Sequence, residues 1–118
     1  MLSHAIQASA TERRSFAPGE AVFSEGDDGN EMFGVLSGEV ELRRGDTVLT
    51  KVGVDGTFGE MAIVERSPRS LTAVAVEPTE VAVIDRHRFL FLVHETPMFA
   101  IEVMRALAAR IHELNTAK

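Results

Sequence analysis

The sequence contains no cysteine, and this absence removes several kinds of chemistry. Disulfide bonds, thiolate metal sites and cysteine nucleophiles are excluded, and a reducing, intracellular setting is compatible with the chain. No run of about 18 apolar residues occurs, so we expect no membrane-spanning helix. The first residues also lack the basic segment and long apolar run of a secretory signal peptide. We therefore expect a cytoplasmic protein with no membrane partner.

Basic residues are in the minority, with 12 lysines and arginines against 18 acidic residues and a net charge of −6. Proteins that bind nucleic acid need a basic face, so no nucleic-acid partner is expected. An acidic domain can still bind a small anion if one arginine or one helix N-terminus concentrates positive potential. The length of 118 residues suits one domain, which we expect to span residues 1–118.

Glycines and turn residues divide the first two thirds of the chain into short segments. Apolar and polar residues partly alternate within them, as in Val40-Glu41-Leu42-Arg43. Short alternating segments with turns at this spacing predict an antiparallel sandwich or barrel. The segments expected to form strands are residues 21–24, 31–36, 39–43, 47–52, 72–76 and 80–84.

The last third of the chain has the periodicity of helices. Asp85 is placed to cap a short helix over residues 86–93. Thr96-Pro97 predicts a second helix start, because a hydroxyl caps the first turn and proline suits the first helical position. Apolar residues then recur at spacings of three and four over residues 101–114, which predicts an amphipathic helix. A short helix is also expected within residues 3–13.

One segment, residues 57–73, interrupts the strand pattern and carries the candidate ligand-binding residues. Within it, Phe58-Gly59-Glu60-Met61-Ala62-Ile63 can form one helical turn whose first amides point outward, which suits an anionic oxygen. Arg69, which follows Pro68, offers two parallel donors to a phosphate. Glu60 is expected to accept a hydrogen bond from a sugar hydroxyl while pairing with Arg69.

This segment resembles the phosphate-binding cassette of cyclic-nucleotide-binding domains. Such domains occur in the catabolite-activator family of bacterial regulators and in the regulatory subunits of cyclic-nucleotide-dependent kinases. The resemblance rests on Phe58-Gly59-Glu60-Met61-Ala62 and Pro68-Arg69-Ser70. Residues 16–27 and 32–40 resemble the family's opening strand and turn and its next hairpin. Several ordered motifs together are far more specific than one alone.

The resemblance implies a mainly β fold, an eight-stranded antiparallel β-roll of jelly-roll type, with flanking helices and a C-terminal lid helix. Arg69 would pair with the cyclic phosphate, and Glu60 would accept from the ribose 2′-hydroxyl. Asn115, near the far end of the lid helix, would cover the base. Further implied ligand contacts are backbone amides at Gly59, Met61, Ala62 and Ser70 and pocket-wall side chains at Phe58, Leu42 and Leu49.

Two positions depart from the family's usual pattern. Leu71 stands two residues after the arginine, where the family commonly has alanine, and its extra volume would either crowd the cassette or repack the core. The turn before the cassette reads Gly53-Val54-Asp55-Gly56 rather than a Gly-Pro-Gly-Asp-like turn. A threonine often stands at position 70 in guanine-preferring relatives, and the serine of this chain does not settle the choice of base. We expect cAMP as ligand ahead of cGMP.

A small barrel enzyme is another possible interpretation of a β-rich chain of this size. A cupin would place two or more histidines and a carboxylate on its strands. The four histidines of this chain are scattered outside the expected strands, and no nucleophile–base pattern is present. We therefore expect no metal, no cofactor other than the nucleotide ligand, and no enzymatic activity. The histidines are His4, His87, His94 and His112.

The implied activity is reception of a cyclic nucleotide, relayed by movement of the last helix. In the activator family a winged helix-turn-helix follows that helix, whereas this sequence ends at Lys118. We therefore expect an effector protein to receive the signal, and the oligomeric state stays open. The alternative is a degenerate β-roll that serves protein interaction and binds nucleotide weakly or not at all. Leu71 favours that alternative, and the presence of Arg69 and Glu60 opposes it.

Overall fold

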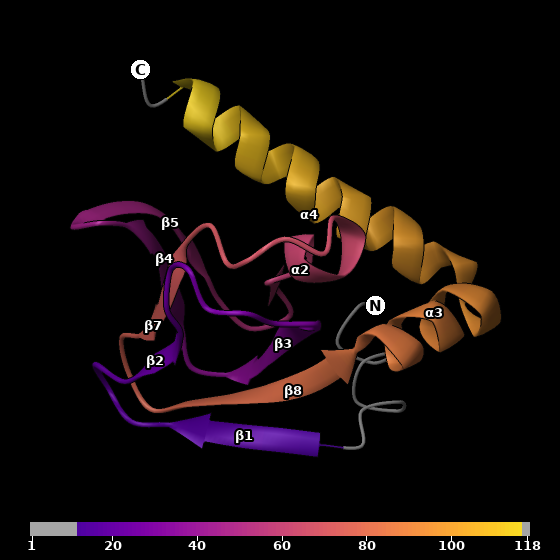
Figure 1. Cartoon of the computed structure of the whole chain (residues 1–118), viewed down its shortest axis with the longest axis horizontal. Helices are drawn as coiled ribbons and strands as arrows, with labels where there is room; N and C mark the ends of the chain where they lie inside the picture. Colours follow the sequence, from indigo (N-terminus) through magenta and orange to yellow (C-terminus); the bar gives the residue numbers. More distant parts are fainter. Residues whose placement is uncertain (1–11, 117–118) are drawn as a thin grey trace.

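The computed structural model describes residues 12–116, with side chains through residue 112. In this part of the chain, eight strands form two four-stranded antiparallel sheets, with strand orders β1-β8-β3-β6 and β2-β7-β4-β5 (Figure 1). The strands are β1 (Glu12–Phe16), β2 (Ala21–Phe23), β3 (Glu31–Ser37), β4 (Val40–Arg44), β5 (Thr47–Val52), β6 (Thr57–Phe58), β7 (Thr72–Ala75) and β8 (Thr79–Asp85). The helices are α2 (Met61–Val64), α3 (Arg86–Glu95) and α4 (Pro97–Thr116).

β8 is an interior strand of its sheet, and both of its faces are buried. Val81 and Val83 face the core between the two sheets, whereas Ala82 and Ile84 pack with residues of α3 and α4. Successive side chains of a strand point to opposite faces. The sequence of β8 therefore reads as a continuous apolar run, and the strand separates two apolar cores.

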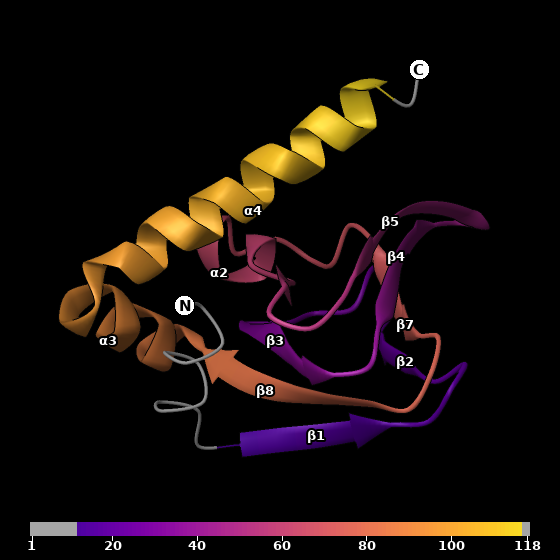
Figure 2. The same ribbon diagram turned by 180° about the vertical axis from the view of Figure 1, so that it is seen from behind.

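The core beneath the helices determines where α3 and α4 lie. Asp85 caps α3 as expected, because its carboxylate accepts a hydrogen bond from the Arg88 amide at 2.7 Å. Leu92 of α3 and Phe99 and Val103 of α4 are buried against β8 and β3. Figures 1 and 2 both show α3 leaving the end of β8 and α4 crossing beside α2 toward the side where β5 lies.

The sequence-based expectations are confirmed for most elements. The antiparallel sandwich, the Asp85 cap and the start of α4 at Pro97 all appear, and each expected strand agrees with the observed one to within one residue at either end. Strands β1 and β6 were not expected from the alternation pattern. Most of the helix expected within residues 3–13 lies outside the described residues, and Glu12 and Arg13 belong to β1. No helix within residues 12–116 combines the length and apolar character that a membrane span requires.

Candidate functional site

The cassette segment joins the two sheets and begins at a sharp backbone turn. β6 ends at Phe58, and Gly59 follows with φ of +81°, a conformation that favours glycine. A Cβ at this position would lie 3.0 Å from Nη1 of Arg69 and 3.3 Å from the rings of Phe23 and Phe33. Glycine therefore allows the turn and also the close approach of the arginine.

α2 is the single helical turn expected from the sequence. The Val64 amide donates to the Glu60 carbonyl at 3.0 Å, and the Glu65 amide donates to the Met61 carbonyl at 2.8 Å. The loop that follows contains Arg66 in the left-handed region, at φ of +56°, and leads to Arg69 before β7. Glu60 and Arg69, at the two ends of this segment, both line one pocket.

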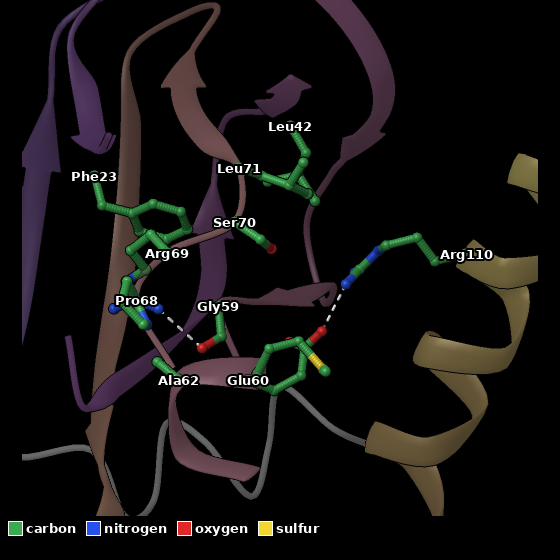
Figure 3. A pocket seen from close by; sticks show the side chains of 11 residues that line it. Phe23, Leu42, Gly59, Glu60, Ala62, Pro68, Arg69, Ser70, Leu71 and Arg110 are labelled. Atoms are coloured by element: carbon green, nitrogen blue, oxygen red, sulfur yellow. Dashed lines mark hydrogen bonds and ion pairs between the residues drawn. The ribbon is translucent and has the colours of Figure 1, made fainter. Parts of the chain in front are cut away.

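The pocket contains about 400 Å³ of empty space, part of it open to solvent, between the cassette, β4 and α4 (Figure 3). Seven of the sequence-predicted ligand residues line it, namely Leu42, Gly59, Glu60, Met61, Ala62, Arg69 and Ser70. The lining also includes Phe23, Pro68, Leu71 and Arg110, which were not predicted as ligand contacts. The structure thus brings together most of the residues that the cassette motif implied.

Arg69 is only 7% exposed, and its guanidinium is fixed by the surrounding backbone. Nη1 donates to the Gly59 carbonyl at 3.0 Å, and Nη2 donates to the Glu31 carbonyl at 2.8 Å. Cζ lies 4.1 Å from the centroid of the Phe23 ring, within the range of a cation–π contact. Burial lowers the pKa of the Arg69 guanidinium, and the charge of Glu31 acts in the opposite direction. Nε is buried without a hydrogen-bond partner.

Glu60 is 1% exposed, and its ion-pair partner differs from the expected one. Oε1 accepts from Nη1 of Arg110 at 2.6 Å, whereas the structure contains no Glu60–Arg69 ion pair among the described residues. The same Arg110 donates from Nη2 to the Thr57 carbonyl at 2.7 Å. The expected pairing with Arg69 is therefore wrong, because Arg69 is turned toward backbone carbonyls and α4 supplies a second arginine. Oε2 of Glu60 is buried without a partner.

Arg110 is the functional candidate that sequence reasoning missed. It stands 50 residues from Glu60, so no local motif links the two. A weaker signal was available in the helix pattern. Phe99, Val103 and Leu107 pack inward from α4, and Arg110 continues that stripe at helical spacing. A charged residue on the inward face of an amphipathic helix requires a buried partner.

The remaining sequence-predicted ligand residues lie elsewhere. Phe58 is fully buried, and its ring stacks on Phe33 with centroids 5.3 Å apart, outside the pocket lining. Leu49 is half-buried in β5 and does not line the pocket either. The Asn115 side chain lies outside the described residues. Leu71, the departure from the family pattern, packs against the core and forms part of the pocket wall beside Leu42 (Figure 3).

The described residues contain no cluster of three or more histidine and acidic side chains that could hold a metal ion. His87 and His94 lie on α3, and His112 lies on α4, in agreement with the expectation that the histidines avoid the strands. His4 lies outside the described residues. Asp55 has φ of +75° in the turn between β5 and β6, as expected for a turn residue.

Comparison with known proteins identifies the family. The cyclic nucleotide-binding domain model matches residues 13–96. The cyclic AMP receptor protein of Thermus thermophilus is 35% identical over 109 residues, which cover 88% of this chain and 50% of that protein. A cAMP-dependent protein kinase regulatory subunit of Mycosarcoma maydis is 36% identical over 73 residues, covering 58% of this chain and 14% of the relative.

Solved structures give the same result for the fold. The crystal structure of the Thermus thermophilus catabolite activator protein superposes with a TM-score of 0.81 at 31% identity, covering 98% of this chain and 55% of that one. A cyclic nucleotide-binding domain from Methylobacillus flagellatus superposes with a TM-score of 0.77 at 27% identity, covering 89% and 64% of the two chains. This likeness confirms the β-roll.

The chain spans about half the length of the bacterial receptor protein that it matches. Membership in a family of ligand-binding regulatory domains agrees with the expectation that the chain is not an enzyme. The matched family model, the relatives and the shared fold together show that this chain belongs to the cyclic nucleotide-binding domain family, with the architecture of the catabolite-activator-type regulators.

Proposed function

We propose that the pocket binds a 3′,5′-cyclic nucleotide, cAMP in preference to cGMP, and that binding is relayed through α4. One observation carries the proposal: a buried arginine and a buried glutamate, each with unused hydrogen-bonding capacity, line the same pocket. The preference for cAMP is supported by the similarity to a cyclic AMP receptor protein.

The unused capacity matches the two polar parts of the ligand. A guanidinium carries five N–H groups, and Arg69 uses two hydrogen bonds for backbone carbonyls. Its remaining donors suit the oxygens of a cyclic phosphate. Oε2 of Glu60 is a buried acceptor without a donor, which suits a ribose hydroxyl. Leu42 and Leu71 supply an apolar surface for the less polar part of the nucleotide.

The relay follows from the ion pair between Glu60 and Arg110. Among the described side chains of α4, Arg110 is the one that lines the pocket. It donates a hydrogen bond to Glu60, the carboxylate that we assign to the ribose. A hydroxyl that donates to Oε2 of Glu60 draws negative charge away from Oε1 and so weakens the attraction between the carboxylate and Arg110. Ligand binding and the position of α4 are therefore energetically linked. The ligand shifts α4 only by the difference between its affinities for the two arrangements. An effector protein would then read the altered surface of α4.

The direct test is calorimetric titration of nucleotide-stripped protein with cAMP and cGMP, with 5′-AMP as a matched control. The linear nucleotide has the same base and sugar, but its phosphate is not cyclised and its charge is greater. We expect one saturable site per chain, tighter binding of cAMP than of cGMP, and weak or no binding of 5′-AMP. Absence of heat and of thermal stabilisation at millimolar cAMP and cGMP would contradict the proposal.

A protein-interaction module that has lost nucleotide binding is the second candidate. Two observations favour it: Leu71 takes up space in the pocket wall, and Arg110 already occupies Oε1 of Glu60. The same titration separates the candidates. A folded protein that binds neither cyclic nucleotide supports the interaction module, whereas saturable binding of either one rejects it.

A further inference from the structure

The loop between β2 and β3, residues 24–30, lies against Arg69 and holds its backbone. The Gly26 amide donates to the Arg69 carbonyl at 2.7 Å, and the Arg69 amide donates to the Asp27 carbonyl at 2.8 Å. The loop is far from the cassette in sequence, and the cassette motif contains none of its residues. The loop therefore holds the backbone of Arg69 in place, a role that the cassette motif does not indicate.

Within this loop, Gly29 has an unusual relation to the guanidinium. A Cβ at position 29 would lie 2.6 Å from Nε, 2.7 Å from Nη2 and 2.8 Å from Cζ of Arg69. These separations are shorter than a carbon atom can approach without displacing the group. Gly29 is not among the residues with positive φ, so its backbone accommodates an L-residue. The steric conflict with Arg69 is therefore the reason for glycine here.

The guanidinium cannot move away without losing contacts. A long side chain usually yields to a new methyl group at small cost, but two carbonyls, of Gly59 and Glu31, hold this one. The Phe23 ring lies 4.1 Å from Cζ, and the Phe33 ring lies 5.6 Å from it. A displacement large enough to clear a Cβ would therefore break at least one hydrogen bond or the contact with Phe23.

We infer that Gly29 is a positioning residue for ligand binding: its missing side chain sets the place and orientation of the Arg69 guanidinium. Its effect on affinity rests on the proposed function, because the oriented donors matter to a ligand only if the pocket binds a phosphate. Its effect on the arginine itself rests on geometry alone. The two effects are therefore measured separately.

The affinity arm compares Gly29→Ala with Gly53→Ala in titrations of the full chain with cAMP. Gly53 is a matched control, because a Cβ there meets nothing within 4 Å and its φ is not positive. We expect Gly29→Ala to weaken binding about tenfold to a hundredfold, the cost of misaligning a charged hydrogen-bond donor. Gly53→Ala should bind as the parent does. Equal affinity of the parent and Gly29→Ala would overturn the inference.

The stability arm repeats Gly29→Ala in an Arg69→Ala background and measures urea midpoints without ligand. If the added methyl conflicts with the guanidinium, Gly29→Ala lowers the midpoint of the parent but not that of Arg69→Ala. Equal losses in both backgrounds would show that the conflict lies elsewhere and would overturn the inference. This arm needs no ligand. If the parent binds neither cAMP nor cGMP, the proposed function and the affinity effect fail together. The urea midpoints still show whether a methyl group at position 29 conflicts with the Arg69 guanidinium.

Discussion

The pocket is lined by two arginines that come from different regions of the molecule, Arg69 buried and Arg110 partly exposed. Arg69 sits on the β-roll, where neighbouring carbonyls and the β2–β3 loop hold both its side chain and its backbone. Arg110 sits on α4 and reaches the same pocket through one carboxylate and one carbonyl. The first arginine is part of a rigid frame, whereas the second joins a separate helix to that frame.

The two arrangements suit different tasks. A guanidinium fixed in advance by the backbone loses little freedom when it binds a phosphate, which favours affinity. A guanidinium that holds a helix through a buried ion pair makes the position of that helix sensitive to anything else that bonds to the carboxylate. We therefore expect substitutions of Arg69 to act mainly on ligand binding and substitutions of Arg110 to act mainly on α4.

Arg69→Ala should have the largest effect. Removing the charged donors is expected to weaken cAMP binding by at least about a hundredfold. It also leaves the carbonyls of Gly59 and Glu31 without their donor, which should cost about 1–3 kcal/mol of stability while the fold is retained. Titration and urea unfolding measure the two effects. Arg66→Ala, an exposed arginine in the same loop, is the control, and binding of cAMP by Arg69→Ala at parental affinity would refute the site assignment.

Arg110→Met should have the next largest effect, on stability. It leaves Glu60 buried without its partner, and breaking a buried ion pair from one side is strongly destabilising. Because Arg110 keeps some exposure, we expect a loss of about 2–3 kcal/mol in urea unfolding, below the usual range for fully buried pairs. Adding Glu60→Gln removes the uncompensated charge and should recover part of the loss.

Arg105→Met, at an exposed position of the same helix, is the matched control and should change stability little. Equal stability losses for Arg110→Met and Arg105→Met would show that the ion pair does not hold α4. The assignment of the two arginines to different tasks would then lose its basis.

Leu71→Ala should have the smallest effect on binding, and in the opposite direction. Shortening this wall residue enlarges the pocket, so we expect cAMP affinity to stay unchanged or to rise by up to about tenfold. Titration of the variant beside Leu90→Ala, an exposed leucine on α3, separates a pocket effect from a general one. A large loss of affinity would show instead that Leu71 contributes a contact to the ligand.

The strands that the sequence pattern missed share a physical cause. β6 has two residues, too few for a period of two to be visible. β1 is an edge strand with mostly charged residues, and it pairs with β8 through the backbone rather than through a buried face. Periodicity reports the burial of side chains, so strands that are very short or largely exposed leave no signal.

The candidate site was predictable to the extent that its chemistry is local in sequence. Gly59, Glu60 and Arg69 lie within one short segment, and the whole motif around them, rather than their spacing alone, indicated an anion site. The orientation of their side chains was not predictable. Arg69 turns toward backbone carbonyls that only the folded sheets bring near, so the expected ion pair with Glu60 does not form.

The sequence by itself determined the antiparallel sandwich, the starts of α3 and α4, the Asp85 cap of α3 and the cassette. Each of these depends on neighbouring residues or on the alternation of buried side chains. Only the tertiary structure decided the ion-pair partner of Glu60, the packing of the Arg69 guanidinium against Gly29 and the position of Leu71 in the pocket wall. Those contacts join the cassette to the β2–β3 loop, β4 and α4. Their geometry arises when the two sheets and the last helix pack together, which no local pattern encodes.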